Sequence, residues 1–151
     1  MNMSEIDDKE GKKIITSKIL IRNSKGEFLA IKNSEDREKS AGKWELPGGR
    51  LKYGEDRFKA AKREMKEEFN LQVEDLQDVV RIEVESDHLV SCYIMFTETW
   101  NGEPELREEK HSEYRWVTAD EFMELNWHSD AGYDIVPMKC LEEYLEKEKI
   151  Y

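Results

Sequence analysis

The chain has 151 residues, enough for one domain that buries a sizeable core without a metal or a disulfide to staple it. Charged residues make up 39% of it and the net charge is −11, an acidic balance that disfavours a nucleic-acid polymer, whose binding needs clustered Lys and Arg. Small phosphorylated molecules are still compatible with this charge, because bound Mg²⁺ can screen their phosphates.

In chain order, residues 1–13 are polar and show no periodicity, so we expect a flexible leader followed by a single domain over residues 14–151. Apolar alternation predicts strands at residues 14–22, 27–32, 44–46, 50–53, 80–85, 89–100 and 113–117. Three helices are expected. One spans residues 55–69, a short one begins at the capping box that Thr118 and Glu121 form, and the last spans residues 135–150. This order indicates one α/β domain.

Two turn signals predict hairpins between these strands. The segment 23–26 (Asn-Ser-Lys-Gly) should return the strand at 14–22 into the strand at 27–32, and Asn101-Gly102 is typical of a tight hairpin. Pro47-Gly48-Gly49 should end the short strand at 44–46.

The cysteines and the hydropathy pattern bear on the compartment. Cys92 and Cys140 form no Cys-x-x-Cys pair and no zinc-type spacing with the histidines, so we expect two reduced core residues. The sequence has neither a signal-peptide pattern nor an apolar run of about 18 residues. We therefore expect a cytoplasmic protein that does not enter a membrane.

The helix over residues 55–69 carries the most information about function. Its apolar residues share one stripe, which should pack on the sheet: Phe58, Ala61, Met65 and Phe69. Its basic residues share the opposite flank: Lys59, Lys62 and Lys66. Glu64, Glu67 and Glu68 fall together in an arc that begins at the edge of the apolar stripe.

This segregation of charge admits two interpretations. A solvated helix stabilised by Glu–Lys pairs would interleave the two signs. Here Glu64 instead has Glu67 and Glu68 three and four residues on, and such like-charged neighbours are unfavourable without a cation between them. Hard oxygen ligands on one rigid face favour Mg²⁺, with Mn²⁺ as the alternative.

The spacing of the segment 46–71 resembles the signature of the Nudix family, G-x5-E-x7-R-E-U-x-E-E-x-G-U, in which U is a bulky apolar residue. The matching residues are Gly49, Glu55, Arg63, Glu64, Met65, Glu67, Glu68 and Leu71. Only the late glycine differs, being Asn70. Asparagine is the residue that, after glycine, best tolerates a left-handed backbone at a helix end, so we expect Asn70→Gly to keep activity and stability.

The resemblance, which is loose outside this segment, implies a fold, a reaction and roles for the residues. The fold is α/β with a mixed β-sheet sandwiched between helices (α/β/α), and the reaction is metal-dependent attack of water on a phosphoanhydride. Metal ligands are expected at Glu64, Glu67 and Glu68 and at the carbonyl of Gly48. Glu67 or Glu68 would also take the proton of the water. Arg63 would orient the glutamates, and Gly49, Glu55 and Asn70 would shape the motif.

Glu98 is a second candidate for the metal or the catalytic water. On the predicted strand over residues 89–100 it would share a face with apolar residues, where a carboxylate is costly unless it is paired or metal-bound. It could also reach solvent near the strand end. The stretch from Glu98 to Pro104 resembles the corresponding part of MutT enzymes, and Glu113 is a weaker candidate for the same role.

The identity of the substrate stays open at this point. The Trp-x-Leu-Pro-Gly-Gly lead-in is similar to that of MutT-type enzymes, which convert oxidised or noncanonical nucleoside triphosphates to monophosphate and pyrophosphate. An ADP-ribose or other nucleotide-sugar pyrophosphatase and a non-catalytic nucleotide-binding module are the alternatives. Candidate substrate contacts are Arg22, Lys32, Leu46 and Asn126. Either a monomer or a homodimer fits the sequence.

Overall fold

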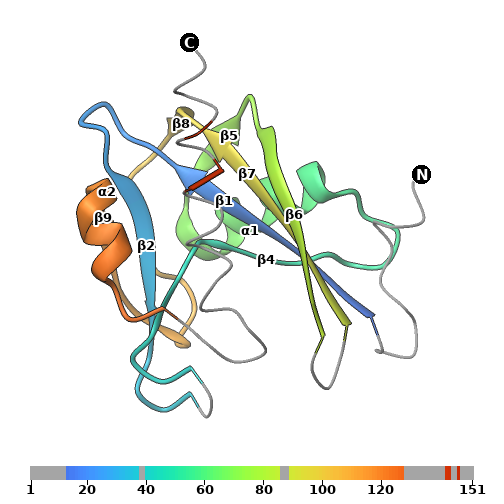
Figure 1. Ribbon diagram of the computed structural model, residues 1–151, viewed down its shortest axis with the longest axis horizontal. Coiled ribbons are helices and arrows are strands. Elements are labelled where there is room, and N and C mark those ends of the chain that lie inside the picture. The colour runs from blue at the N-terminus through green and yellow to red at the C-terminus, as the bar shows by residue number, and fades with distance from the viewer. Residues whose placement is uncertain (1–12, 38–39, 86–88, 128–141, 144–145, 147–151) are drawn as a thin grey trace.

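The computed structural model describes residues 13–37, 40–85, 89–127, 142–143 and 146, which form nine strands and two defined helices (Figure 1). The strands are β1 (Lys13–Ile21), β2 (Phe28–Asn33), β3 (Trp44–Glu45), β4 (Gly48–Arg50), β5 (Gln72–Glu74), β6 (Gln77–Glu85), β7 (Leu89–Thr97), β8 (Thr99–Asn101) and β9 (His111–Val117). The helices are α1 (Arg57–Phe69) and α2 (Ala119–Glu124). Residues 1–12 of the predicted leader and nearly all of the predicted terminal helix lie outside the described residues, while Lys13, also assigned to the leader, begins β1.

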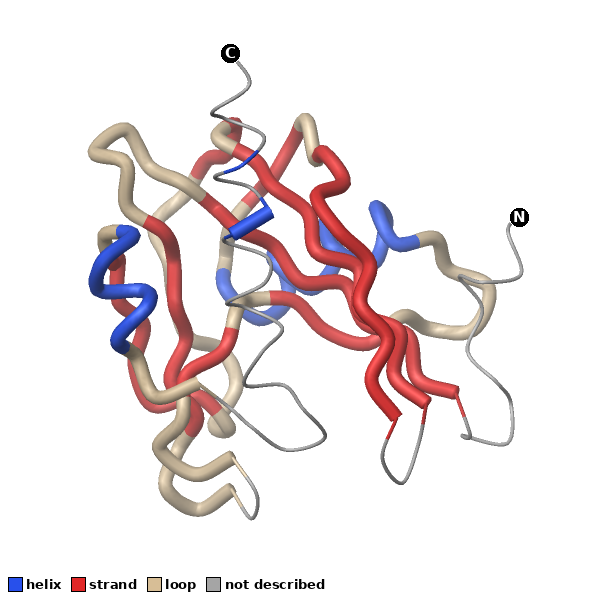
Figure 2. Tube along the Cα trace, in the orientation of Figure 1, coloured by secondary structure: helices blue, strands red, loops and turns tan. Residues whose placement is uncertain are grey.

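The central layer is a mixed four-stranded sheet in the order β4-β1-β7-β6. β1 runs parallel to β7 along its whole length, from Lys13 opposite Leu89 to Ile21 opposite Thr97, while β4 and β6 are antiparallel to their neighbours. Figure 2 shows these long strands side by side across the middle of the molecule. The predicted α/β architecture with a mixed sheet is confirmed.

A second sheet of order β3-β2-β9 lies beside the first, and β5 pairs with β8 in a short ribbon. The predicted hairpin between the first two long strands is therefore wrong: β1 and β2 share only the bridge between Arg22 and Phe28, because β4 and β7 already occupy both edges of β1. The predicted Asn101-Gly102 hairpin is also wrong, since β8 pairs back with β5.

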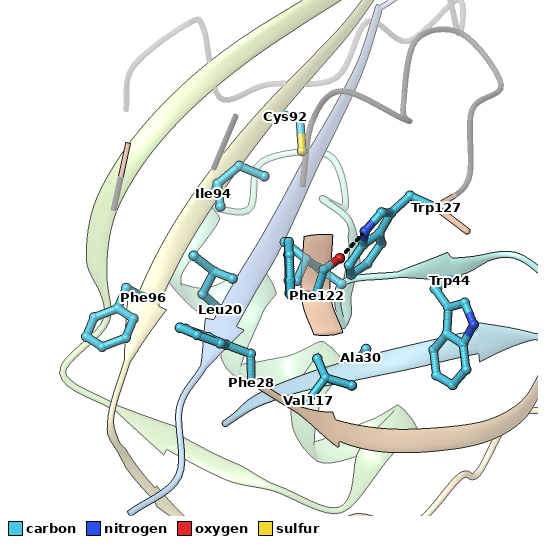
Figure 3. Close-up of a cluster of buried hydrophobic side chains, with 11 residues drawn as sticks. Leu20, Phe28, Ala30, Trp44, Cys92, Ile94, Phe96, Val117, Phe122 and Trp127 are labelled. Carbon is cyan, nitrogen blue, oxygen red and sulfur yellow. Dashed lines mark hydrogen bonds between the residues drawn. The ribbon is translucent and has the colours of Figure 1, made fainter. Parts of the chain in front are cut away.

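The two faces of β1 are buried in different cores. Ile19 and Ile21 pack with the apolar stripe of α1, whereas Leu20 points to the other side, into a cluster shared with β2, β7, β9 and α2. Figure 3 shows that second cluster, where the indole nitrogen of Trp127 donates to the carbonyl of Phe122 at 2.8 Å. The capping box of Thr118 and Glu121 that opens α2 is formed as predicted.

Helix α1 lies against β1 and β4 and is bounded by two local signals. Asp56 caps its start by accepting from the backbone N–H of Lys59, so the helix begins two residues later than predicted. Asn70 ends it in a left-handed conformation with φ of 60°, as its sequence position predicts. Ala61, Met65 and Phe69 are buried on the predicted stripe.

The segment between β3 and β4 crosses from one sheet to the other. Glu45 pairs with Ile31 in the second sheet, and Gly48 pairs with Lys18 in the first. The crossing is fixed by the bond from the Ile19 N–H to the Pro47 carbonyl at 3.0 Å. The glycines thus form a strand rather than merely ending one. No helix in the described part of the chain is long and apolar enough to cross a membrane.

Candidate active site

The site is built where α1 meets β4. A Cβ atom on Gly49 would lie 2.6 Å from the carboxyl carbon of Glu64, so only glycine lets this carboxylate sit directly on the strand. The neighbouring Gly48 has φ of 135°, and a Cβ there would meet the backbone oxygen of Ser17 at 2.0 Å. The two glycines therefore have separate tasks: Gly48 allows β4 to join β1, and Gly49 makes room for Glu64.

Arg63, in the middle of α1, connects the helix to the loop that precedes it. Its Nε and Nη2 donate to the two carboxylate oxygens of Glu55 at 2.7 and 2.9 Å, a bidentate geometry. Nη2 also donates to the Arg50 carbonyl at 3.3 Å, and the Lys52 N–H donates to Glu55. These contacts hold the pKa of Glu55 below its ordinary value, chiefly through the hydrogen bond from Arg63.

The same guanidinium reaches the glutamates of the site. Its Nη1 donates to Glu64 at 2.9 Å and to Glu67 at 3.3 Å. Glu67 is otherwise turned to solvent, with 56% of its side chain exposed, whereas only 13% of the Glu64 side chain is exposed. Arg63 thus orients Glu64 and keeps Glu67 at the rim.

Glu64 and Glu68 form a carboxyl pair that is largely withdrawn from solvent, and each carboxylate has one cationic partner, Arg63 for Glu64 and Lys110 for Glu68. Burial and the adjoining Glu68 carboxyl raise the pKa of Glu64 to about 7, although Arg63 opposes this. The pKa of Glu68 is lowered: burial alone would raise it, but the hydrogen bond with Glu64 and the ammonium of Lys110, 2.8 Å away, outweigh that effect. The pair therefore shares one proton near neutral pH.

The surroundings of this pair fit a divalent cation. Oε2 of Glu68 is buried and finds no hydrogen-bond partner among the residues that the structure describes. In that same part of the chain, no three acidic, His or Cys side chains converge tightly enough to hold an ion alone, and Glu67 is held by Arg63 at the exposed rim. The oxygen atoms of Glu64 and Glu68 beside the Gly-Gly strand are nevertheless the donor type that suits a hard cation.

Beyond Glu68, a second group of charges lies between the two sheets. The Glu45 carboxylate is 4.0 Å from Lys18 and 3.7 Å from Nε2 of His111, and the Lys18 ammonium donates to the Leu46 carbonyl at 3.3 Å. Burial would raise the pKa of Glu45, but Lys18 and then His111 lower it strongly. His111 stacks on Phe69, the residue after Glu68, so this group adjoins the carboxyl pair.

Glu98 does not join these residues. Of the two predicted positions, an apolar strand face or solvent near the strand end, the structure has the second: β7 ends at Thr97, whose hydroxyl accepts from the Thr99 N–H at 3.0 Å and bends the chain. Glu98 is exposed at this bend and lines a surface hollow with Asp75 and Gln77 that contains none of the helix glutamates. Glu113 pairs with Lys32 at 3.7 Å.

Three of the four expected substrate contacts gather around β3. Lys32 lies opposite Trp44, and the Trp44 N–H donates to the carbonyl of Asn126 at 2.8 Å. Leu46 follows β3 but is buried in the core, and Asn126 is exposed. Arg22 lies elsewhere, at the end of β1, with its guanidinium over Phe28.

Sequence reasoning did not anticipate Lys110, Arg107, His111, Lys18 or Glu45 in this region. Lys110 and Arg107 lie in the loop between β8 and β9, whose contacts with α1 leave no local pattern in the sequence. The one available signal was Lys18, a charged residue within the mostly apolar strand β1, which indicates a buried acidic partner.

Comparison with known proteins identifies the family and the fold of the chain. The family described as NUDIX domain matches residues 12–137. The 8-oxo-dGTP diphosphatase of Escherichia coli (strain K12) is 29% identical over 111 residues, which are 71% of this chain and 85% of the relative. A Mycobacterium tuberculosis protein named for the same activity is 36% identical over 96 residues, 62% of this chain and 67% of the relative. The crystal structure of the MutT protein from Methanosarcina mazei Go1 superposes with a TM-score of 0.76 at 26% identity and covers 91% of this chain and 96% of that one.

A mixed sheet with helices against it and a glutamate-rich helix seated on a Gly-Gly strand defines the class of Nudix hydrolases. The chain belongs to the NUDIX domain family, and its similarity to the diphosphatases and to MutT makes it a MutT-like Nudix hydrolase.

Proposed function

We propose that the protein is a metal-dependent pyrophosphohydrolase that converts a nucleoside triphosphate, oxidised or noncanonical, to monophosphate and pyrophosphate. The observation that carries the proposal is the Glu64–Glu68 pair, which is largely buried beside Gly49 and has one carboxylate oxygen with no hydrogen-bond partner among the described residues. The relatives named for 8-oxo-dGTP support the substrate class.

In this proposal Glu64 and Glu68 hold Mg²⁺ or Mn²⁺, with Glu67 and the carbonyl of Gly48 completing the donor set. When bound, the ion polarises the phosphate oxygens and offsets charge on the leaving group. Glu98 is left out of this set, because it is exposed beside residues of another surface hollow.

The reaction balances with water alone. The water oxygen forms a bond to one of the two phosphorus atoms of the α–β bridge, and the bond between that phosphorus and the bridging oxygen breaks. Attack at the α-phosphorus expels pyrophosphate and attack at the β-phosphorus expels the monophosphate, in each case with the electron pair of the broken bond. Glu67 or Glu68 takes the proton that the water gives up. Arg63 keeps Glu64 and Glu67 in place during this step through its Nη1 donor.

We place the nucleoside part of the substrate near β3. Lys32, Trp44 and Asn126 meet there, next to the Glu45 group that adjoins the carboxyl pair. Charged and amide groups at the wall between two sheets provide hydrogen-bond partners for a base edge.

The test compares wild type with Glu68→Gln on a panel of nucleotides with Mg²⁺ and identifies the products by mass. The panel contains the standard triphosphates, 8-oxo-dGTP, ADP-ribose and a dinucleoside polyphosphate. We expect monophosphate and pyrophosphate from a triphosphate, and a loss of about a thousandfold or more in the variant. Glu124→Gln, the same change on the exposed surface of α2, is the matched control and should act as wild type.

ADP-ribose as the best substrate would overturn the substrate class but not the mechanism. Nucleotide binding without any cleavage, under Mg²⁺ or Mn²⁺, would instead favour a binding module. Equal rates for wild type and Glu68→Gln would remove the carboxyl pair from the chemistry.

A further inference from the structure

The loop between β8 and β9 is fastened to the C-terminal end of α1. The N–H of Glu105 donates to the carbonyl of Phe69 and the N–H of Arg107 to that of Glu68, both at 3.0 Å. The Arg107 guanidinium also donates to the carbonyl of Lys66 at 3.2 Å. The loop therefore satisfies the carbonyls that a helix leaves without partners at its end.

Asn70, where the chain departs from the family signature, takes part in this fastening. Its side-chain oxygen accepts from Arg107 at 2.8 Å, and its side-chain N–H donates to the Glu103 carbonyl at 3.5 Å. Gly102 approaches so closely that a Cβ there would lie 2.6 Å from the Asn70 carbonyl oxygen. A glycine at position 70 could keep the backbone turn but could not make the contact with Arg107.

At the far end of the same loop, Lys110 reaches into the site. Its ammonium is 2.8 Å from Oε1 of Glu68, whose side chain is only 6% exposed, while the Lys110 side chain itself is 44% exposed. Its carbonyl accepts from the Ser34 N–H at 2.8 Å, which fixes the backbone from the other side. One oxygen of Glu68 is thus already taken by a positive charge, and the other has no hydrogen-bond partner among the described residues.

We propose that Lys110 is an internal counter-ion that competes with the divalent cation for Glu68, and that the Asn70–Arg107 contact holds it there. The inference rests on the proposed function, because it takes Glu68 as a metal ligand. The Lys110 ammonium already neutralises part of the charge on Glu68, and it would repel a divalent cation bound at the other carboxylate oxygen. We therefore expect metal binding to weaken or displace the contact between Lys110 and Glu68.

This arrangement links the metal to the substrate. While Lys110 is paired with Glu68, a divalent cation must bind beside a positive charge, so the apparent metal affinity is lower than in molecules with Lys110 displaced. A displaced ammonium has lost its partner, and a phosphate of the substrate is a suitable new one. Metal and nucleotide should then strengthen each other's binding by the same factor.

The experiment measures Mn²⁺ binding by electron paramagnetic resonance, without nucleotide, on the full chain. Lys110→Met should tighten Mn²⁺ binding by about three- to tenfold, since the competitor is gone. Lys110→Arg keeps the charge and should remain near wild type. Lys66→Met is the matched control: it removes one exposed lysine of α1 and changes the net charge equally, away from the carboxyl pair.

Asn70→Gly separates direct competition from general repulsion, because it changes no charge. It should loosen the loop and tighten Mn²⁺ binding by about twofold. Equal Mn²⁺ affinity of Lys110→Met and Lys66→Met would overturn the inference while leaving the proposed function intact. Failure of wild type to bind Mn²⁺ any better than Glu68→Gln would overturn the metal site itself, and the inference with it.

Discussion

Helix α1 presents two carboxylate sites that lie one after the other and differ in how their charge is balanced. Glu55, just before the helix, accepts hydrogen bonds from Nε and Nη2 of Arg63 and from the backbone N–H of Lys52. Glu64 and Glu68, within it, share a single Nη1 donor and one lysine, and one of their oxygens has no donor in the described structure. A carboxylate with hydrogen-bond donors on both oxygens stabilises the fold. A pair of adjacent carboxylates that leaves one oxygen without a donor can bind a cation.

The largest effect should come from Arg63→Ala, which breaks both sites at once. It leaves Glu55 without its bidentate partner and frees Glu64 and Glu67. We expect activity to fall by about a thousandfold and the free energy of unfolding to fall by about 2–3 kcal/mol. Urea unfolding and initial rates measure the two effects. Arg63→Lys, which cannot serve both sites, should recover little activity; full recovery would mean that charge alone matters.

Gly49→Ala should separate the two sites. The added methyl meets the far end of the Glu64 side chain rather than backbone, so Glu64 moves while the fold is kept. Activity should fall by about a hundredfold with less than about 1 kcal/mol lost in stability. Gly48→Ala meets the Ser17 backbone and should unfold the protein instead. Wild-type activity in Gly49→Ala would show that Glu64 need not sit on β4.

The pH dependence of stability should have opposite signs at the two sites. The pKa of Glu64 is raised to about 7, so the metal-free protein gains stability from this group below its ordinary pKa and loses it as pH rises through 7. The pKa of Glu55 is lowered, so its contribution to stability is fully present above the ordinary pKa of a glutamate. That contribution is lost as the pH falls through the lowered pKa of Glu55 in the folded protein.

Thermal unfolding without metal should therefore show a decline of about 1–2 kcal/mol between pH 5 and 8 that Glu64→Gln lacks. Mg²⁺ should abolish the decline, because it replaces the shared proton. A wild-type curve parallel to that of Glu64→Gln would mean that the pair does not share a proton.

The smallest effect is expected for Glu55→Gln. The amide can still accept from Arg63, so only the charge is lost, and we expect about 1 kcal/mol of stability and less than about tenfold in activity. Denaturant unfolding and kcat measure this. A loss as large as that of Glu68→Gln would place Glu55 among the catalytic groups rather than the anchoring ones.

Local patterns in the sequence predicted the local features of the site. The stripe through Met65 and the left-handed end at Asn70 follow from helical periodicity and backbone preference, and the structure confirms both. The sequence could not decide between a buried and an exposed Glu98, because the Thr97 hydroxyl ends β7 through a contact that no periodicity shows. Lys110 reaches Glu68 from a distant loop, so tertiary packing alone brings them together.

The parallel pairing of β1 with β7 also governs how the protein is made. β1 can pair with β4 as soon as residues 48–50 have been made, but its whole length is paired only with β7, far later in the chain. The sheet on which α1 packs is therefore complete only after residues 89–97 have been synthesised. Because such long-range closures are slow, we expect the carboxylate pair to be fixed late in folding.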